Sequence, residues 1–448
     1  MGITNFTKWL VETYPQCVLE KFETFEYIYI DLNCLLHMVI TGCMNENMLR
    51  KRLCSRIDVI LKNAKCLKKI ILAMDGPAPI AKILMQRERR LKVLRTIESN
   101  SDLLDAINPL YFSPGTKFMN SLKDKLLVHV KKYTDCNIDV SILDGHGESE
   151  LKLINELIIN NNIKPKSNHL IMSTDADIII MAYHISNINI PIFINNYKFV
   201  ISINKLHSEH IKIVGKSLCS GTDFMILSMM MGNDYLPKFE SFKIETIWEI
   251  YKIVIKNDKR GCLIDGRINL EFLIKLFRNI VFRLPKRIIK HFNIVTHNID
   301  LYENYYDGLI WCIQMYSNQD VAKYDYKYIY NSLPHPLGFL IYLESMNKIK
   351  DNIVEKKYNI IDVPSNIYAA LILPKYAYNL IDGDISEKFD EKFKYLYEEE
   401  FCQQCIKYDT DKYIKNKINK DHLQHKLTHK IITIDDIKNI VTLLAKKN

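Results

Sequence analysis

Short apolar runs alternate with longer amphipathic segments over the first 240 residues of the chain. Three of these runs, residues 27–30, 69–74 and 170–173, are almost continuously apolar, as in strands that are buried on both faces. A further run, residues 190–203, alternates around Asn195-Asn196 and predicts a hairpin. The segments between the runs place apolar side chains three and four residues apart, which predicts helices over residues 47–67, 79–99 and 116–133. Together they predict an α/β fold whose mainly parallel sheet has helices on both faces.

The pattern changes after Pro237, where helical periodicity dominates and Lys, Asn, Tyr and Ile become dense. We therefore expect an α/β domain over residues 1–240 and a mainly helical domain over residues 241–448.

The composition agrees with a soluble globular protein, since 48% of the 448 residues are hydrophobic and 25% are charged. The longest apolar runs, such as residues 224–231, are far shorter than the ~18 residues of a membrane-spanning helix, which excludes a membrane protein. No secretory signal opens the chain, and eleven cysteines without framework spacing indicate thiols in a reducing compartment. We expect a cytoplasmic protein. The formal net charge of +9 favours a polyanionic partner such as nucleic acid.

Carboxylates follow the predicted strands. Because the carboxyl ends of parallel strands meet at one edge of a sheet, these acids can converge on one site. Two pairs have their members two residues apart, so that in an extended or turning segment both carboxylates point the same way. Solvated loop residues or helix caps would be the alternative. Clustered carboxylates repel one another unless cations neutralise them, and hard oxygen ligands suit Mg²⁺ or Mn²⁺. The candidate metal ligands are Asp31, Asp75, Glu148, Glu150, Asp175, Asp177 and Asp234.

The predicted helix after Asp75 carries a group of basic and amide side chains. Lys82, Gln86, Arg89 and Arg90 lie at i, i+4, i+7 and i+8, so they share one helix face and could surround a single phosphate. A solvated basic helix face is the alternative reading of the same spacing.

Several blocks along the chain resemble, in the same order, those of the 5′→3′ exoribonuclease (Xrn-type) family. The resemblance covers nearly all of residues 1–240, and a weaker match is found at Tyr306-x-Gly308-Leu309-x-Trp311. The blocks are Met1-Gly2-Ile3, Asp31-Leu32-Asn33 with His37, Asp75-Gly76-Pro77-Ala78-Pro79 with Lys82 and Gln86-Arg87, Ser113-Pro114-Gly115-Thr116, Gly147-Glu148-Ser149-Glu150, Asp175-Ala176-Asp177, and Gly232-Asn233-Asp234-Tyr235-Leu236-Pro237.

The resemblance implies a fold of the PIN or flap-nuclease type and a specific chemistry. That chemistry is hydrolysis of single-stranded RNA with a 5′ monophosphate, releasing nucleoside monophosphates. Two Mg²⁺ ions, for which Mn²⁺ would substitute, would be held by the seven acids, and a pair of metals ~4 Å apart can activate water and stabilise the leaving oxygen. Lys82, Gln86, Arg89 and Arg90 match the family's 5′-phosphate pocket, and Asn33 joins the substrate-binding residues. A decapping or 5′-end-processing activity would act upstream.

Base stacking is the other requirement of an enzyme that grips single strands. His37 matches the family's stacking histidine. Its partner aligns with Tyr326, in the aromatic run of residues 324–330, although alternating tyrosines are equally typical of an exposed strand.

Two other functions remain open from sequence. A structure-specific flap endonuclease acting on DNA shares the acidic architecture, and a non-catalytic RNA-binding module could share the fold. The basic face with Lys82 and Arg90 demands a free 5′ phosphate, and the intact set of seven acids favours catalysis, so we expect the exoribonuclease.

A separate cysteine and histidine cluster lies near the end of the sequence. Cys402-x-x-Cys405, followed by His422, His425 and His429, has the spacing of a Cys₂His₂ zinc site. The two cysteines could equally be i, i+3 neighbours on a helix, and the family resemblance does not supply this site.

Overall fold

The computed structural model describes the chain except for residues 1–2, 4, 20–23, 101–105, 135, 186–189, 293–298, 319–331, 350–362, 384–388, 390–392, 416–424, 426–428, 430–431 and 446–448. Its strands form a seven-stranded sheet in the order β1-β7-β6-β5-β2-β3-β4 and a separate two-stranded sheet, β8-β9. The seven strands are β1 (Val18–Leu19), β2 (Phe25–Asp31), β3 (Cys66–Ala73), β4 (Asp139–Leu143), β5 (His169–Met172), β6 (Ile192–Asn195) and β7 (Val200–Ser202).

The strand pairings confirm the predicted sheet. β3 pairs in parallel with β4, and β5 pairs in parallel with β6, whereas β7 runs antiparallel to both β6 and the edge strand β1. The hairpin predicted around Asn195-Asn196 is the β6-β7 pair. The three predicted apolar strands are β2, β3 and β5, and most of their residues are buried.

The chain forms two compact units, and each consists of separate stretches of the sequence. The first boundary between them lies between Tyr29 and Ile30, inside β2. The first unit contains Met1–Tyr29, Glu150–Asp320 and Tyr326–Tyr358, and the second contains Ile30–Ser149, Val321–Asp325 and Asn359–Asn448. Neither unit ends near residue 240, so the division into residues 1–240 and 241–448 stays a prediction. The described elements after residue 240 are helical apart from the hairpin of β8 (Leu263–Ile264) and β9 (Arg267–Ile268), as the helical periodicity of the sequence predicts.

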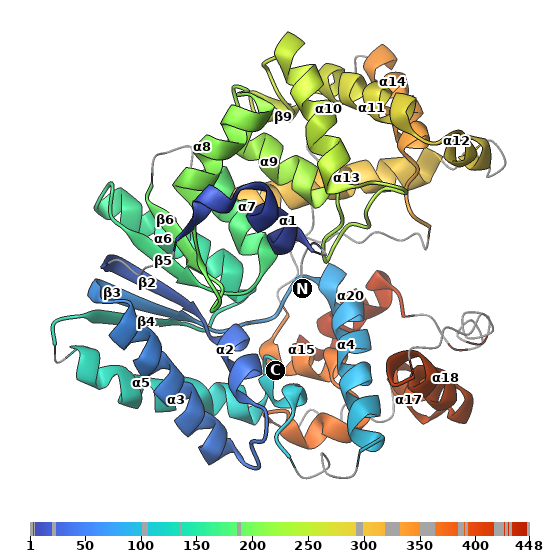
Figure 1. The fold of residues 1–448 in the computed structure, drawn as a ribbon. Helices are drawn as coiled ribbons and strands as arrows, with labels where there is room; N and C mark the ends of the chain where they lie inside the picture. Colours follow the sequence, from blue (N-terminus) through green and yellow to red (C-terminus); the bar gives the residue numbers. More distant parts are fainter. Residues whose placement is uncertain are drawn as a thin grey trace. The chain divides into compact units, whose positions relative to one another are not determined.

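In the second unit, the sequence predicts closely the helix that precedes β3 and two helices between β3 and β4. The predicted helices over residues 47–67, 79–99 and 116–133 are α3 (Glu46–Asn63), α4 (Ile80–Glu98) and α5 (Lys117–Thr134). α3 ends earlier than predicted because the apolar residues from Cys66 onward belong to β3. α5 packs on both β4 and α3, and α3 also packs on α2 (Leu32–Val39) (Figure 1).

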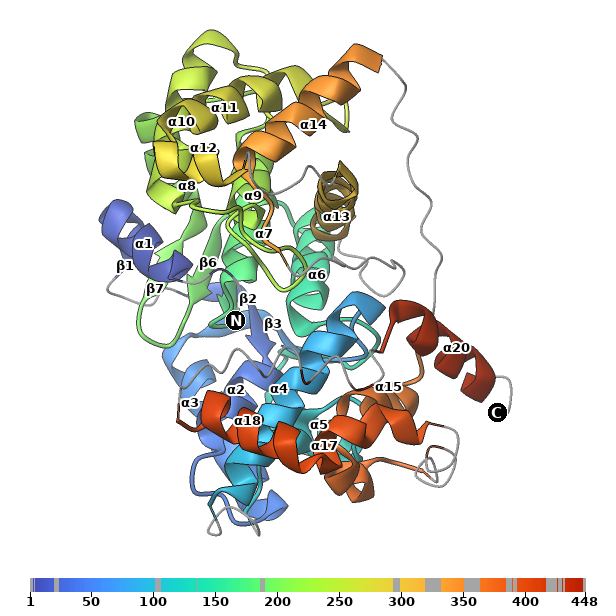
Figure 2. The same cartoon turned by 90° about the vertical axis from the view of Figure 1, so that its right-hand side faces the viewer.

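The α-helices described later in the second unit include α15 (Ser365–Ile372), α17 (Glu398–Phe401), α18 (Gln403–Tyr413) and α20 (Ile434–Ala445). Three of them, α15, α18 and α20, pack against α4 (Figure 2). Their shared core contains Ile83, Ile367, Leu371 and Ile437, each at most 1% exposed. Apolar side chains some 280 residues after α4 in the sequence therefore fix the position of that helix.

The first unit contains the remaining strands and helices α1 (Phe6–Thr13), α6 (Ser149–Ile163), α7 (Ala176–Ile185), α8 (Ile203–Val214), α9 (Ser220–Met229), α10 (Ile244–Asn257), α11 (Leu270–Arg283), α12 (Lys286–Phe292), α13 (Ile299–Asn318) and α14 (Pro336–Ile349). Stacked aromatic rings form part of its core. The rings of Tyr183 and Phe224 lie 3.9 Å apart, and Trp248 stacks on Phe224 at 5.4 Å.

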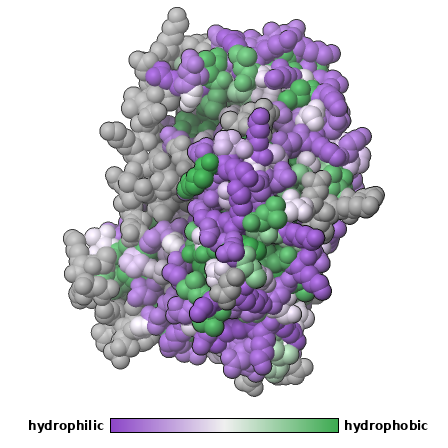
Figure 3. Space-filling view, turned by 90° about the vertical axis from the view of Figure 1, so that its left-hand side faces the viewer, coloured by the Kyte–Doolittle hydropathy of each residue, from purple (hydrophilic) through white to green (hydrophobic). Residues whose placement is uncertain are grey.

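The face of the molecule drawn in Figure 3 is mostly hydrophilic and carries smaller apolar patches. Among the described helices, none is long and apolar enough to cross a membrane. All eleven cysteines are free thiols.

Candidate active site and nucleic-acid-binding residues

Asp31 and Asp75 lie where β2 and β3 end, as predicted. Asp31 caps helix α2, because its Oδ1 atom accepts a hydrogen bond of 3.0 Å from the backbone N–H of Cys34. Asn33, in the first turn of that helix, accepts a hydrogen bond of 3.0 Å from the backbone N–H of Asp75 through its Oδ1 atom. The ends of the two strands are thereby joined by a side-chain bridge that runs from Asn33 to Asp75.

The glycine-rich turn before α6 is fastened to the segment that follows β3. The backbone N–H of Gly76 donates to the carbonyl of Gly147 at 2.8 Å, and the N–H of Gly147 donates to the carbonyl of Pro77 at 3.0 Å. Gly147 has a φ of +86°, and a Cβ atom on Gly76 would lie 2.1 Å from the carbonyl oxygen of Gly145. Glycine is therefore required at both positions: at Gly147 for the left-handed backbone, and at Gly76 because a side chain has no space.

Glu148 and Glu150 flank the start of α6. The backbone N–H of Ser149, which lies between them, donates to Asp75 Oδ1 at 2.9 Å. The turn therefore also holds the Asp75 carboxylate in place. The two glutamates were expected to point the same way along an extended or turning segment. Only Glu148 lies in the turn, because Ser149 begins the helix and Glu150 belongs to its first turn.

Lys82 of α4 pairs with the carboxylate of Glu148, and both side chains are largely buried. The sequence assigned Lys82 to a phosphate pocket and Glu148 to a metal site. In the structure the two groups neutralise each other, which satisfies a buried lysine that would otherwise be costly. Lys82 therefore links the two predicted groups of residues and belongs to both.

Arg90 follows Lys82 further along α4, and its Nε donates a hydrogen bond to Ser113 Oγ at 2.9 Å. Desolvation lowers the pKa of Arg90, while the nearby Tyr368 and Asp75 raise it. The Ser113-Pro114-Gly115-Thr116 block therefore contributes a hydroxyl that orients a basic side chain, and Arg90 lies close enough to Asp75 to interact electrostatically.

Gln86 and Arg89 complete the predicted basic face and are both partly exposed. The Oε1 atom of Gln86 is buried and has no hydrogen-bond partner among the described residues. Arg87, which points elsewhere, donates to the backbone carbonyls of Leu371 and Leu396, at 2.5 Å to Leu371. Arg87 thus fastens α4 to later segments of the chain.

His37 lies in the last turn of α2 with an exposed side chain whose ring packs edge-on against Phe112, at 5.2 Å between ring centroids. Desolvation and the charge of Arg90 lower the pKa of His37, and Asp75 opposes them. The ring is therefore near both a carboxylate and a guanidinium of the predicted site. Tyr326, its predicted stacking partner, lies outside the described residues.

Tyr368 of α15 is a site residue that sequence reasoning missed. It is fully buried, and its pKa is raised first by desolvation and then by Glu148, while Arg90 and Lys82 act in the opposite direction. Its hydroxyl therefore lies among the three charged residues. The sequence carries no pattern around Tyr368 that could have indicated this, because it comes from a buried helix far along the chain.

The first unit holds the other four acids, and Asp175 and Asp177 lie at the start of α7. The Oδ1 atom of Asp175 accepts a hydrogen bond of 2.9 Å from the backbone N–H of Asp177, and the backbone N–H of Asp175 donates to Ser173 Oγ at 3.2 Å. The pair thus forms a helix start and not an extended segment. Ser173 thus uses its hydroxyl within this turn.

Tyr316 of α13 is the second residue that sequence reasoning missed. Its hydroxyl donates to Asp177 Oδ2 at 2.9 Å, and desolvation together with Asp177 raises its pKa far above the ordinary value. Tyr306-x-Gly308-Leu309-x-Trp311 lies in the same helix. That weaker block could have pointed to α13 as a helix that supports the site.

The block that contains Asp234 also lies against α13. Asn233 accepts hydrogen bonds from the backbone N–H groups of Tyr235 and Leu236, at 2.9 and 2.8 Å, which folds the block into a tight turn. The ring of Tyr235 packs edge-on against Trp311 at 4.9 Å. The turn and Asp177 therefore share α13 as their support.

The structure groups the predicted residues into two sets. The second unit brings together Asp31, Asn33, His37, Asp75, Lys82, Gln86, Arg89, Arg90 and Glu148, and the first unit holds Glu150, Asp175, Asp177 and Asp234. In the first unit, α13 supports Asp177 and the turn around Asp234. In the second, hydrogen bonds and charge interactions connect Asp75 to Asn33, Ser149, His37 and Arg90.

Comparisons with known proteins point to one family. Residues 1–196 match the family model described as the XRN 5′-3′ exonuclease N-terminus. The chain is 25% identical to 5′-3′ exoribonuclease 1 of Saccharomyces cerevisiae over 337 residues, which cover 62% of this chain and 22% of the yeast protein. It is 24% identical to 5′-3′ exoribonuclease 1 of Homo sapiens, covering 64% of this chain and 19% of the human protein. The chain thus spans about a fifth of the length of these relatives.

Solved structures give a more distant likeness. The catalytic core of Rad2 in complex with DNA substrate matches at a TM-score of 0.39 and 13% identity, covering 85% of this chain and all of that chain. A bacteriophage T5 flap endonuclease in complex with DNA and metal ions matches at a TM-score of 0.31 and 10% identity, covering 72% of this chain and 99% of that one. These scores are low, so the α/β fold rests on the strand pairings themselves. Over residues 1–196 the chain is similar to the XRN 5′-3′ exonuclease N-terminus, as its motifs predict.

Proposed function

We propose that this protein is a 5′→3′ exoribonuclease that hydrolyses single-stranded RNA with a 5′ monophosphate and releases nucleoside monophosphates. One observation carries the proposal. Within the second unit, carboxylates suited to a metal, Asp75 and Glu148, lie beside cations suited to a phosphate, Lys82 and Arg90. A phosphodiester hydrolase that holds its substrate by a terminal phosphate needs both groups close together.

Mg²⁺ fits the donor set as the cofactor, with Mn²⁺ as a substitute, because all the proposed ligands are carboxylate oxygens. Two ions held by Asp31, Asp75, Glu148, Glu150, Asp175, Asp177 and Asp234 would supply an activated water and stabilise the leaving oxygen. The chain's own contribution is to hold the carboxylates in place. Backbone N–H groups fix Asp31 and Asp75, and the Tyr316 hydroxyl fixes Asp177.

The 5′ phosphate is proposed to bind on α4, between Arg89, Arg90 and Gln86, with Lys82 joining this pocket to Glu148. Ser113 holds Arg90 in orientation, which lowers the entropy that the side chain loses when it binds. Asn33 and His37 are proposed to contact the terminal nucleotides, His37 by stacking through its exposed ring. Tyr326 remains the proposed stacking partner.

The helical residues after residue 240 are proposed to help to cover the RNA. Tyr316 and Tyr368 support this role, since both come from that part of the sequence and both lie beside proposed site residues. The protein would act in the cytoplasm, on RNA whose 5′ monophosphate comes from a decapping or 5′-end-processing activity.

Substrates that differ only at the 5′ end test the proposal. Single-stranded RNA with a monophosphate should be degraded from that end. The same RNA with a 5′ hydroxyl cannot form the charge-assisted hydrogen bonds that a phosphate makes with the pocket cations, and it should lose ~100-fold or more in kcat/KM. A 5′ triphosphate should be a poor substrate because the pocket is built for a compact group. Each reaction should require Mg²⁺ and stop with chelator.

Two variants of α4 make the test specific. Arg89→Ala combined with Arg90→Ala should reduce the preference for monophosphate over hydroxyl RNA. Lys92→Ala is the matched control, since Lys92 lies on the same helix with an exposed side chain outside the proposed pocket. Equal rates on all three RNA ends, ready cleavage of circular RNA, or preferred cleavage of flap DNA would contradict the exoribonuclease. Binding of RNA without any hydrolysis would instead favour a non-catalytic module.

A further inference from the structure

Two cysteines and two histidines of the second unit converge at the start of α18. One ligand atom from each of Cys402, Cys405, His425 and His429 lies within 4.8 Å of all the others. Cys402 Sγ is 3.2 Å from His425 Nε2, and Cys405 Sγ is 3.4 Å from His429 Nε2. Among the described residues, this is the cluster of cysteine and histidine side chains whose geometry could hold a metal ion.

The distances agree with a tetrahedral metal centre. Zinc binds sulfur at about 2.3 Å and imidazole nitrogen at about 2.0–2.1 Å, so sulfur and nitrogen ligands of one ion lie about 3.6 Å apart. The two sulfur to nitrogen distances here are slightly shorter than this value. A pairwise hydrogen bond would explain one such contact, but it would not explain why all four atoms converge.

The surroundings suit a zinc site as well. His429 Nδ1, the ring nitrogen that points away from Cys405, is 3.8 Å from the carboxylate of Glu398. An acidic partner on the second nitrogen is typical of histidines that bind metals, because it fixes the orientation of the ring. The rings of His425 and His429 lie nearly perpendicular, at 88°, with 5.3 Å between their centroids, so each can direct Nε2 toward a different sulfur.

The backbone positions of the two cysteines are also compatible with binding one metal ion. Cys402 directly precedes α18 with an extended backbone, and Cys405 lies in the first turn of that helix, so only Cys405 is on the helix. This arrangement does not exclude zinc, because three residues along a helix start place both sulfur atoms on one side. Thiolate and imidazole together select zinc over magnesium, which separates this cluster from the carboxylates described above.

We propose that Cys402, Cys405, His425 and His429 bind one Zn²⁺ ion in a closed, four-ligand structural site. Both thiols release their protons to solvent when the metal binds. With four protein ligands there is no open position for water or substrate, so the ion stabilises the fold and takes no part in hydrolysis.

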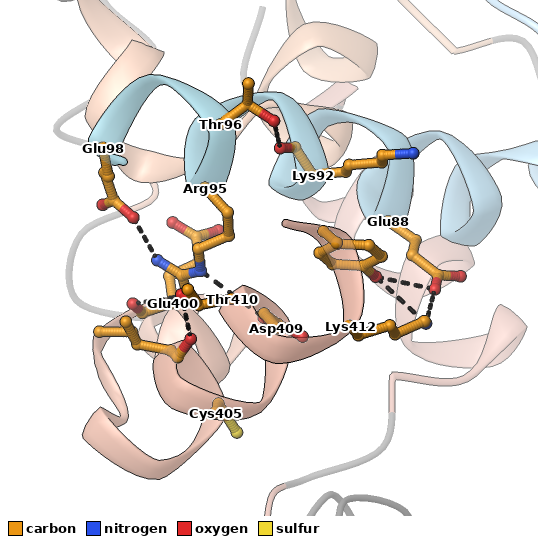
Figure 4. Close-up of polar contacts among 12 residues, drawn as sticks. Glu88, Lys92, Arg95, Thr96, Glu98, Glu400, Cys405, Asp409, Thr410 and Lys412 are labelled. Carbon is orange, nitrogen blue, oxygen red and sulfur yellow. Dashed lines mark hydrogen bonds and ion pairs between the residues drawn. The ribbon is translucent and has the colours of Figure 1, made fainter. Parts of the chain in front are cut away.

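The site would fasten a segment that is far from α4 in sequence but packs on it. Arg95 of α4 reaches the backbone carbonyl of Glu400 at 3.1 Å and the carboxylate of Asp409 at 3.6 Å (Figure 4). Further along, Glu88 accepts from Lys412 at 2.7 Å and from the hydroxyl of Tyr413 at 2.9 Å (Figure 4). Cys405 lies on the same helix as Asp409, so zinc would hold the helix that makes these contacts.

Metal analysis of the full-length protein tests the proposal without RNA. After dialysis against metal-free buffer, plasma mass spectrometry should find about one zinc per chain, as a closed site retains its metal. Cys402→Ser and Cys405→Ser should each reduce zinc to background. Cys136→Ser, which removes an exposed thiol elsewhere in the same unit, should retain it. Zinc at background in the unmodified protein, or equal zinc in all variants, would overturn the proposal.

Cobalt substitution provides a readout on the unmodified chain, without variant proteins. The unmodified chain, stripped of metal and titrated with Co²⁺, should develop the intense visible bands of tetrahedral cobalt and a sulfur-to-cobalt charge-transfer band. A weak octahedral spectrum would overturn the site. Because neither measurement uses a nuclease assay, failure of the zinc site and failure of the proposed function can be distinguished.

Discussion

Replacing Arg95 by methionine should destabilise the second unit more than any exposed charge change. Arg95 and Asp409 form a buried ion pair, with each side chain only 1% exposed and a closest N to O distance of 3.6 Å. Arg95 also donates to Glu98 at 2.9 Å and to the carbonyl of Glu400 at 3.1 Å. Methionine retains most of the volume and removes the charge together with these bonds.

The expected cost follows from the burial of Asp409. Removing one partner of a buried ion pair leaves the other charge in a site without water, which typically costs about 3–5 kcal/mol. Asp144→Asn is the matched control, because Asp144 and its partner Lys123 lie in the same unit with side chains 44% and 39% exposed, and such surface pairs contribute only ~0.2–1 kcal/mol. Arg95→Met combined with Asp409→Leu should recover much of the loss, since neither charge then remains buried.

The assay has to report on the second unit. All three tryptophans, Trp9, Trp248 and Trp311, lie in the first unit, so their fluorescence follows that unit. Hydrogen exchange of peptides from α4 and α18 in increasing urea gives the local free energy of opening of the second unit. A loss below about 1 kcal/mol for Arg95→Met, or an equal loss for Asp144→Asn, would show that the pair is solvated and that the reasoning from burial is wrong.

Two further predictions concern the first unit. Burial lowers the pKa of His169 and His184 to about 4 and that of His210 to about 3, so below pH 6.5 the unfolded chain binds protons that the folded chain does not. Stability should therefore fall as pH decreases from about 6.5 to 4, by about 1.4 kcal/mol per pH unit for each histidine, and urea unfolding followed by tryptophan fluorescence at pH 7 and pH 5 measures this. A flat profile would contradict the burial of these rings. Tyr316→Phe removes the hydroxyl that holds Asp177 and should lower kcat about 10- to 150-fold, corresponding to about 1.5–3 kcal/mol for a hydrogen bond to a charged group. Tyr306→Phe, on the same helix, removes a hydroxyl without a hydrogen-bond partner among the described residues and should leave kcat unchanged, so equal losses would argue against positioning by Tyr316.

The local features of this chain could be predicted from sequence because short-range patterns determine them. The apolar runs that lead to Asp31 and Asp75 fit strands, and they form β2 and β3. The apolar spacing around Lys82 fits a helix, and it forms α4. The end of α3 was predicted too late, since a helix and the following strand share one continuous apolar stretch there.

The contacts between distant segments could not be predicted in the same way. Tyr368 reaches Lys82 and Glu148 only because α15 packs on α4, and no local pattern encodes that packing. The Lys82 and Glu148 ion pair was missed for a different reason. The sequence singled out each residue for a different group, but its partner depends on the turn that Gly76 and Gly147 fasten.

That reciprocal hydrogen bonding between the Gly76 and Gly147 segments has an evolutionary consequence. Charged side chains can be lost one at a time while the backbone stays folded, so a descendant of this protein could lose its acids gradually. A side chain at position 76 would collide with the Gly145 carbonyl and separate the two segments at once. Mutational drift should therefore remove Asp75 before it changes Gly76, and a lineage that abandons hydrolysis would still carry this glycine as a trace of its ancestry.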